Sequence, residues 1–164
     1  RYPREIPAHT NCTELMANID IAPTLLDYAE ISIPENMQGI SCRNMIAGKP
    51  QEEYHKGIYF RYWMHLAHQH DNPAHYGVRT KDYKLTFYYG LALDAEGAVD
   101  KPTQPGWELY DLQKDPGELK NVYEDPAYYE IREELKGLLC ELKEKYQDQD
   151  EAYVELQRTF EKYK

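Results

Sequence analysis

Positively charged residues are few in this sequence. The 19 Lys and Arg residues stand against 29 Asp and Glu, so the 164-residue chain has a formal net charge of −10. Proteins that bind nucleic acid by neutralising phosphates need a basic stripe, and proteins that bind anionic membrane surfaces need a polybasic segment. The charge therefore argues against a nucleic-acid partner and against a membrane partner.

Long apolar runs and cysteine patterns are absent as well. No window approaches the run of about 18 apolar residues that a transmembrane helix requires. The three cysteines, Cys12, Cys42 and Cys140, are odd in number and widely spaced, which fits neither a zinc site nor a disulfide framework. Cys140 occupies an apolar position of a predicted helix, where we expect a small buried hydrophobe. The sequence begins at Arg1 without a Met or a leader, and we expect it to be a piece of a longer chain.

Tyrosine, in contrast, is abundant: the chain has 16 Tyr against 3 Phe and 2 Trp. Its apolar ring and polar tip suit half-buried sheets and the walls of polar pockets. Aromatic and alternating segments predict strands at residues 57–66, at residues 76–89 with a turn or bulge near residues 81–82, and at residues 107–112. Four tyrosines are expected to pack in this sheet rather than to form a platform for a sugar: Tyr83, Tyr88, Tyr89 and Tyr110.

The strongest helix signal begins at Asp125, a good N-cap, followed by Pro126 at a position that tolerates proline. Apolar residues then recur with the helical period. They are Ile131, Leu135, Leu138, Leu139, Leu142 and Tyr146. We expect this helix to lie across one face of the tyrosine-rich sheet. The polar, acidic residues 147–164 predict a weaker helix that frays.

The first 50 residues alternate short apolar runs with turn signals. Residues 1–3 look like the end of a strand. Asp20 is a good N-cap for a short helix, and we interpret it as a cap rather than as a metal ligand. Residues 44–46 predict a turn or a short helical piece, and the polar residues 51–54 are expected to be exposed.

Four segments resemble, in the same order, the C-terminal part of sulfatases. They are Ile19-Asp20-Ile21-Ala22-Pro23-Thr24-Leu25-Leu26-Asp27, Met37-Gln38-Gly39-Ile40-Ser41, residues 75–85, and Trp107-Glu108-Leu109-Tyr110-Asp111-Leu112 with Lys114-Asp115-Pro116, Glu118 and Asn121. Each segment alone is a weak signal, whereas all four in the family's order form a strong one. The chain looks most like the arylsulfatase A-like and glycan-sulfatase branch of the alkaline phosphatase-like superfamily.

The resemblance implies an α/β chain whose C-terminal part is α+β. Residues 1–50 would form the end of the sulfatase catalytic core. Residues 51–146 would form the C-terminal subdomain, a small antiparallel sheet of about four strands packed against a helix, and residues 147–164 an acidic helical tail. The resemblance further implies a partner, the N-terminal catalytic part of the same polypeptide, and a periplasmic or extracellular location.

The resemblance also implies that the parent enzyme hydrolyses sulfate esters of glycans or aryl compounds. Sulfatases make a formylglycine nucleophile from Cys or Ser in a Cys/Ser-x-Pro/Ala-x-Arg motif and hold calcium with Asp-rich sets. Cys12 is followed by Thr-Glu-Leu, Cys42 by Arg-Asn-Met and Cys140 by Glu-Leu-Lys, so none of them fits the motif. We therefore expect no catalytic or metal-binding residue in this chain. It would complete the fold, border the pocket for a sulfated glycan, and be inactive alone.

Five of the six histidines fall within residues 55–75. Imidazole and guanidinium groups can donate hydrogen bonds to sugar hydroxyls or sulfate. The candidate substrate-binding residues are His75, Arg79, His65, His68 and His70. Two other interpretations of the histidines stay open, a zinc or copper site and a polar surface loop. Arg79 could instead pair with Asp111 or Glu108.

Other functions also stay open at this stage. The chain could be a stand-alone carbohydrate-binding or interaction module, or belong to a phosphoesterase relative from the same superfamily. If residues 1–33 normally meet a catalytic core, they would expose apolar surface without it. Exposed apolar patches promote association, so we expect dimers or larger species.

Overall fold

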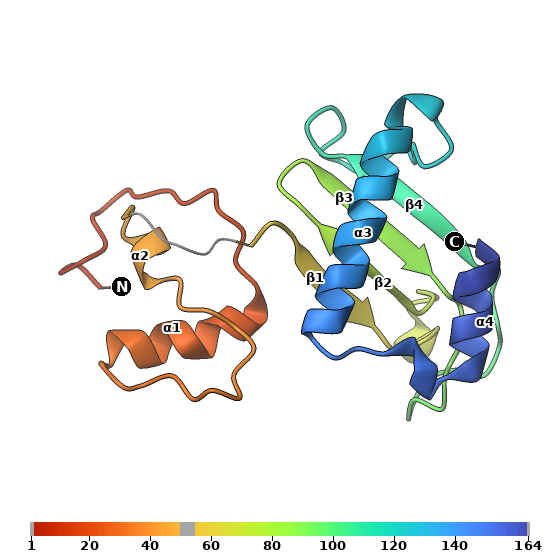
Figure 1. Ribbon diagram of the computed structural model, residues 1–164, viewed down its shortest axis with the longest axis horizontal. Coiled ribbons are helices and arrows are strands. Elements are labelled where there is room, and N and C mark those ends of the chain that lie inside the picture. Colours follow the sequence, from red (N-terminus) through yellow and green to blue (C-terminus); the bar gives the residue numbers. More distant parts are fainter. Residues whose placement is uncertain (1, 50–54, 164) are drawn as a thin grey trace. The chain divides into compact units, whose positions relative to one another are not determined.

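A computed structural model describes residues 2–49 and 55–163, so the prediction for residues 51–54 lies outside the described residues. The chain divides into two compact units, Arg1–Ile58 and Tyr59–Lys164. The first contains the helices α1 (Ile21–Tyr28) and α2 (Arg43–Ile46), which follow the short 3-10 helix η1 (Asn18–Asp20) (Figure 1).

The start of the first unit differs from the sequence-based prediction. Residues 2–6 form a turn rather than the end of a strand, because the amides of Glu5 and Ile6 both donate to the carbonyl of Tyr2. The short helical piece predicted at residues 44–46 is confirmed as α2.

Asp20 is fully buried, and its carboxylate organises the loops around α1. The amide of Ala17 donates to Oδ2 at 2.7 Å, and the amide of Ile40 donates to Oδ1 at 2.9 Å. Nε2 of His55 lies 2.7 Å from Oδ2 and must be the donor, since a carboxylate only accepts. The expected N-cap bond into α1 is not made. Asp20 instead bonds back to the residue before η1 and ties a distant loop and a histidine to the same point.

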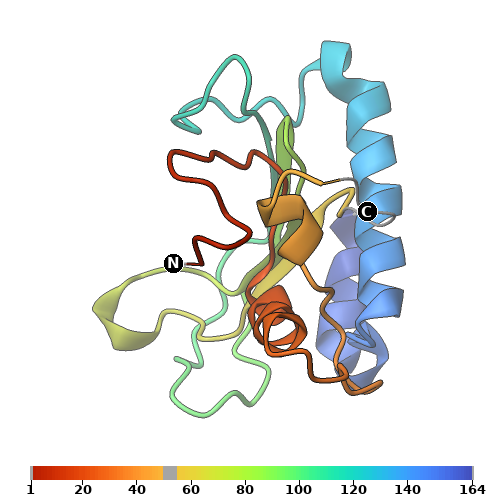
Figure 2. The ribbon, with the colours of Figure 1, turned by 90° about the vertical axis from the view of Figure 1, so that its left-hand side faces the viewer.

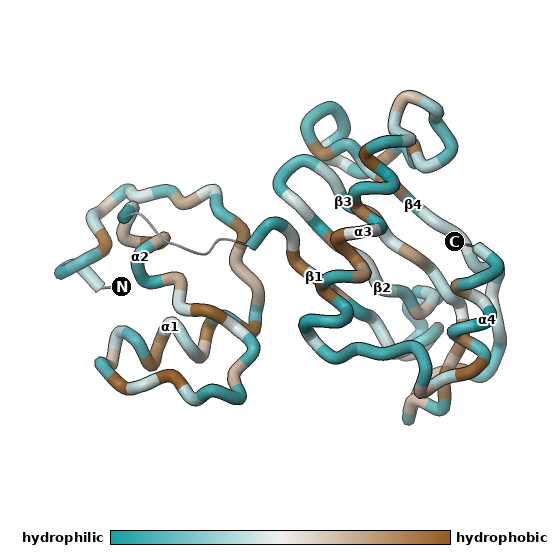
Figure 3. The backbone as a smooth tube through the Cα atoms, viewed as in Figure 1, coloured by the Kyte–Doolittle hydropathy of each residue, from teal (hydrophilic) through white to brown (hydrophobic). Residues whose placement is uncertain are grey.

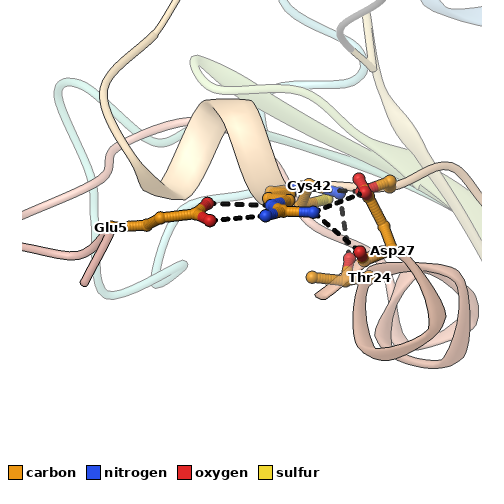
Figure 4. Close-up of polar contacts among 6 residues, drawn as sticks. Glu5, Thr24, Asp27 and Cys42 are labelled. Atoms are coloured by element: carbon orange, nitrogen blue, oxygen red, sulfur yellow. Dashed lines mark hydrogen bonds and ion pairs between the residues drawn. The ribbon is translucent and has the colours of Figure 1, made fainter. Parts of the chain in front are cut away.

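Two further side chains extend this polar stripe along α1. Thr24 and Asp27 follow Asp20 at spacings of four and three residues, which places all three on one side of the helix. Thr24 Oγ1 accepts from the amide of Cys42 at 2.9 Å, and Asp27 Oδ1 accepts from Arg43 at 3.0 Å. Figure 4 shows Thr24 and Asp27 reaching from α1 toward this segment.

Arg43 links the stripe to the beginning of the chain. Its Nε donates to Glu5 Oε2 at 2.8 Å, its other nitrogens pair with Glu5 and Asp27, and its guanidinium lies over the ring of Tyr28. The Arg43 hydrogen bond lowers the pKa of the Glu5 carboxyl.

Gly39 is a steric requirement of this packing. A Cβ atom at this position would lie 2.1 Å from the carbonyl oxygen of Ile19, inside van der Waals contact. The chain can bring the amide of Ile40 to Asp20 only if position 39 has no side chain. The first two segments that resemble sulfatases therefore form one packed unit.

The second unit is a four-stranded sheet with the order β1 (Ile58–Tyr62), β2 (His75–Arg79), β3 (Tyr83–Tyr88) and β4 (Gly106–Asp111). β2 pairs antiparallel with β3, and β3 pairs antiparallel with β4. The long helix α3 (Tyr129–Lys145) lies along one face of the sheet (Figures 1 and 2). The predicted antiparallel sheet with one covering helix is thus confirmed. Shorter elements complete the unit: η2 (Ala67–Gln69), η3 (Pro126–Tyr128), η4 (Asp150–Ala152) and α4 (Val154–Tyr163).

The core of this unit lies between the sheet and the helices. Hydrophobic and hydrophilic residues interchange along the strands and α3 (Figure 3), and along β4 every second residue is buried. The residues that form this cluster include Tyr76, Val78, Leu85, Phe87, Leu109, Leu135 and Leu139. Cys140 is exposed, contrary to the prediction, because it lies about 100° around the helix from Leu139.

The C-terminal segment packs on the same core. Leu156 of α4 is fully buried, Phe160 lies against the rings of Phe87 and Trp107, and Trp107 Nε1 donates to the carbonyl of Tyr163 at 2.8 Å. These contacts give the polar, acidic segment a buried side that its composition does not suggest.

A charged cluster joins this segment to the sheet. Asp148 accepts from the hydroxyl of Tyr59 and from Arg61, and Lys143 Nζ lies 2.5 Å from Asp150 Oδ1. The Arg61 guanidinium also lies 3.5 Å from the centroid of the Trp63 ring. Each of these largely buried charges has a partner of opposite charge on another element. The pairing offsets the free-energy cost of removing the charges from water.

The last segment that resembles sulfatases builds the turns after β4. Asn121 Oδ1 accepts from the amides of Leu109 and Tyr123, each at 3.0 Å, and its Nδ2 donates to the carbonyl of Trp107. Asp111 accepts from Lys114 and Tyr128, and the bond from Lys114 lowers the pKa of Asp111 to about 2. These polar residues thus serve the fold by satisfying backbone groups.

Replacing Asp20 tests the network of the first unit. In Asp20→Asn, an NH2 group, which can only donate, replaces one of the two carboxylate oxygens. At least one donor that now bonds to Asp20 then loses its acceptor, and leaving a buried donor unpaired costs free energy. We expect opening of residues 17–46 to become easier by about 3 kcal/mol, which makes proteolytic cleavage there about a hundredfold faster. Limited proteolysis followed by mass spectrometry measures the cleavage rate within residues 17–46.

The exposed Asp100 provides a matched control. Asp100→Asn should leave the cleavage rate unchanged. Equal cleavage of Asp20→Asn and the unmodified chain would contradict the role given to Asp20.

Candidate functional site

The side of the sheet opposite α3 carries two of the five candidate residues. His75, Gly77 and Arg79 alternate along β2 with Tyr76 and Val78, which are buried in the core. Successive side chains of a strand point to opposite faces, so His75 and Arg79 share the face that α3 does not cover. We call this the outer face. The register places Tyr88 beside His75 and Lys84 beside Arg79.

His75 lies among aromatic rings on the outer face. Its centroid is 5.4 Å from that of Tyr62, 4.8 Å from that of Tyr88 and 6.1 Å from that of Phe60. Nδ1 is 2.8 Å from the carbonyl of Pro73 and must donate to it. Burial lowers the pKa of His75 below 6.5, so the ring is neutral at pH 7 and Nε2 can accept a hydrogen bond.

Gly77 makes room for this aromatic group. A Cβ atom at position 77 would lie 2.6 Å from Cζ of Phe60 and 2.2 Å from the carbonyl oxygen of Leu85. Phe60 can therefore cross β2 at this point only because residue 77 has no side chain.

Charged residues occupy the other end of the outer face. Lys84 Nζ lies 2.5 Å from Glu118 Oε2, and Arg79 NH1 lies 3.6 Å from Glu118 Oε1. The carboxylate beside Arg79 is thus Glu118 rather than the expected Asp111 or Glu108. Alternation along β4 turns Asp111 to the α3 side, and the register places Glu108 beside Thr86 rather than beside Lys84, the neighbour of Arg79. Half of the Arg79 side chain is exposed (51%), so it remains open to a ligand.

The four tyrosines that were assigned to sheet packing divide between the two faces. Tyr89 is fully buried, and Tyr83 packs against Tyr128. Tyr88 and Tyr110 instead lie on the outer face near Glu108, which accepts from the Tyr110 hydroxyl at 3.0 Å. Burial, with Glu108 nearby, raises the pKa of Tyr88 to about 12, so its hydroxyl stays protonated at neutral pH.

The other three candidate histidines come from the segment that contains η2. His65 is fully buried; its Nδ1 accepts from the amide of Ala74 at 3.0 Å and its Nε2 donates to the carbonyl of Lys101 at 3.0 Å. His68 and His70 are exposed, with ring centroids 6.0 Å apart. They belong to the loop around η2, which extends from the side of the sheet opposite α3 (Figure 2). His65 supports this loop, and a role of the five residues in substrate binding stays a prediction.

Other residues of the outer face were not found from the sequence. Phe60, Tyr62, Lys84 and Glu108 reach it from three strands. Alternation assigns each of them to one side of its strand, but only the register shows that they gather around His75. A turn assigned firmly to residues 80–82 would have provided the register of β2 with β3.

The described residues also bear on metal binding and on membrane insertion. Among residues 2–49 and 55–163, no group of three or more His, Cys, Asp and Glu side chains could hold a metal ion. None of the helices in this part of the chain is long and apolar enough to cross a bilayer.

Comparison with known proteins identifies the family. Residues 1–145 match the family described as N-sulphoglucosamine sulphohydrolase, C-terminal. The chain belongs to this family of sulfatase C-terminal regions. The expectation drawn from the four segments is thereby confirmed.

Two relatives show how much of a sulfatase the chain covers. An N-acetylglucosamine-6-O-sulfatase of Bacteroides thetaiotaomicron is 34% identical over 92% of this chain and 25% of the relative. An arylsulfatase of Clostridium perfringens is 32% identical over 87% of this chain and 25% of the relative. The chain thus spans about a quarter of the length of these curated relatives.

Solved structures agree with the fold. One, a protein in complex with its substrate D-glucosamine-2-N,6-O-disulfate, matches 92% of this chain and 28% of its own length, with a TM-score of 0.76 and 34% identity. The phosphonate monoester hydrolase of Agrobacterium radiobacter matches 76% of this chain and 24% of its own, with a TM-score of 0.54 and 21% identity. The second likeness shows the shared fold alone.

The environment of His75 predicts a pH effect. Because the folded pKa lies below 6.5, the unfolded chain binds the proton more readily, and stability falls as the pH drops through 6.5. NMR titration should give His75 a pKa below 6.5, with the Nδ1-protonated tautomer at pH 7. In His75→Gln, this part of the pH dependence of unfolding should vanish. A His75 pKa of 6.5 or above would contradict the burial described here.

Proposed function

We propose that the protein containing this chain hydrolyses sulfate esters of a glycan, and that the chain completes the fold and borders the substrate. The family match over residues 1–145 carries this proposal. A 6-O-sulfated glucosamine is the first substrate to test, because an N-acetylglucosamine-6-O-sulfatase is 34% identical to the chain.

We assign the bond-breaking chemistry to residues outside this chain. Hydrolysis of a sulfate ester needs an activated nucleophile, positive charge on the sulfate oxygens, and an acid for the leaving group. Sulfatases obtain the first two from formylglycine and calcium. None of the three cysteines lies in the motif that yields formylglycine, and the described side chains offer no metal-binding group. We therefore propose that the chain does not cleave substrate alone.

The outer face supplies groups suited to a sulfated sugar. His75 offers an aromatic ring and an acceptor at Nε2, and the hydroxyl of Tyr88, hydrogen-bonded to Glu108, stays protonated. Arg79 is half exposed beside Lys84, so positive charge is available at one end. Ring surface, neutral polar groups and a guanidinium together suit a sugar that carries an anionic group.

The exposed apolar residues of the first unit support a further proposal. Large exposed side chains occur along the first unit, namely Met16, Ile19, Ile21, Leu25, Ile31 and Ile33. We propose that the remainder of the longer protein covers them and that the 164-residue chain alone self-associates through them.

Activity of the longer protein tests the main proposal. The gene product that contains this chain together with a formylglycine motif should desulfate glucosamine 6-O-sulfate, and the 164-residue chain should not. In the longer protein, Arg79→Gln should raise KM about tenfold with little change in kcat, since one charge-assisted contact is lost. Lys101→Gln, at an exposed site, is the control.

Two results would contradict this assignment. Activity of the repurified 164-residue chain would show that it holds its own catalytic groups. Saturable binding of sulfated sugars by a protein that never cleaves them would favour a carbohydrate-binding module.

Sedimentation tests the proposed self-association. The 164-residue chain should form dimers or larger species at high concentration, and Leu25→Glu should shift it toward monomer, because Leu25 is an apolar residue of the first unit that is 63% exposed. Leu119→Glu, which changes a leucine that is 90% exposed in the second unit, should leave the distribution unchanged. A clean monomer of the unmodified chain would overturn the proposal.

A further inference from the structure

A groove runs along α3 on a side that the sheet does not cover. One wall is a stripe of α3 at spacings of three and four residues: Tyr129, Arg132, Glu133, Lys136, Gly137 and Cys140. The other wall includes Tyr123 and Tyr163. Neither His75 nor Arg79 belongs to this groove, so it is separate from the outer face.

Aromatic rings hold the two cations of the groove in place. The Arg132 guanidinium lies 4.9 Å from the centroid of Tyr123 and 5.0 Å from that of Tyr129. The Lys136 ammonium lies 5.4 Å from the ring centroids of both Tyr123 and Trp107. Tyr123 and Trp107 are themselves stacked, with centroids 5.7 Å apart. The cations are thus ordered before any ligand arrives, which lowers the entropy cost of binding.

Arg132 and Lys136 use only some of their hydrogen-bond donors within the described part of the chain. Arg132 NH1 donates to the carbonyl of Tyr123 at 3.0 Å, and Arg132 Nε and Lys136 Nζ share a single carboxylate, Glu133, at 3.3 and 3.4 Å. The side chains of Arg132 and Lys136 are 19% and 16% exposed. Glu133 is itself about half exposed, so solvent weakens both ion pairs. Glu124 also lines the groove. An ammonium has three donors and a guanidinium five, so both cations can turn donors toward an anion that displaces Glu133.

Gly137 keeps the floor of the groove open. A Cβ atom at this position would meet nothing within 4 Å. Glycine inside a helix costs about 0.5–1 kcal/mol relative to alanine, and no neighbouring atom in the described part of the chain requires it here. The missing side chain leaves space between the cations and Cys140.

We propose that this groove binds a sulfated saccharide unit. The sulfate would take donors from Arg132 and Lys136, and the sugar ring would lie against Tyr129 and the open backbone at Gly137. Bidentate or paired donors suit the oxygens of a sulfate, and tyrosines combine an apolar surface with a hydroxyl. The choice of a glycan over other anions rests on the proposed function, whereas the groove itself needs no catalysis. The chain would thus contact a long glycan at a second place.

Calorimetry of the 164-residue chain tests this site. The probes are a 6-O-sulfated glucosamine disaccharide, the same disaccharide without sulfate, and inorganic sulfate. The sulfated disaccharide should bind saturably, and the other two at least about tenfold more weakly. Lys136→Gln and Gly137→Phe should each weaken binding about tenfold or more, the first by removing a donor and the second by filling the floor.

Matched variants separate this site from the outer face and from misfolding. Gly137→Ala and Lys101→Gln should bind as the unmodified chain does, and circular dichroism should show that all variants keep their helix. Loss of binding in His75→Ala and Arg79→Gln, but not in Lys136→Gln, would place the saccharide on the outer face and overturn the proposal. Equal affinity for inorganic sulfate would overturn the saccharide as the ligand. Absence of saturable binding would overturn the site, and desulfation by the longer protein would still stand.

Discussion

Buried backbone amides that lie outside helices and sheet ladders must find acceptors, and this structure satisfies them with side chains. Asp20 accepts two amides in the first unit, and Asn121 accepts one amide from β4, at the edge of the sheet, and one from the turn that follows β4. His65 accepts the amide of Ala74 where the histidine-rich loop returns to the sheet. The polar residues that make the sequence resemble sulfatases are therefore largely the residues that fasten its loops.

Periodicity predicted the regular elements because burial on one side leaves a repeat in the sequence. The alternation of β4 and the apolar positions of α3 are two such repeats, and both elements occur where they were expected. The roles of single polar residues were harder to predict. The position of Asp20 suggested a cap, but its bond to the amide of Ile40 joins residues 20 apart in the sequence. Cys140 was misplaced because a shift of one residue moves a side chain by about 100° around a helix.

The sequence predicted which types of residue form the candidate site, but not which residues from different strands meet there. His75 and Arg79 share a face because they are four apart on one strand. The rings around His75 come from other strands, and their meeting depends on the register. His65 belonged to the same cluster in the sequence, yet its two nitrogens are both used to support a loop. Nearness in the sequence therefore said little about which histidines face a ligand.

Hydrogen exchange of the unmodified chain tests the central claim most directly. The amides of Ala17, Ile40, Ala74 and Leu109 each donate to a side chain. If side-chain acceptors fasten the loops, these four amides should exchange at least about a hundredfold more slowly than in an unstructured chain. Exchange at unstructured rates would show that the loops are held by other means and would contradict the account.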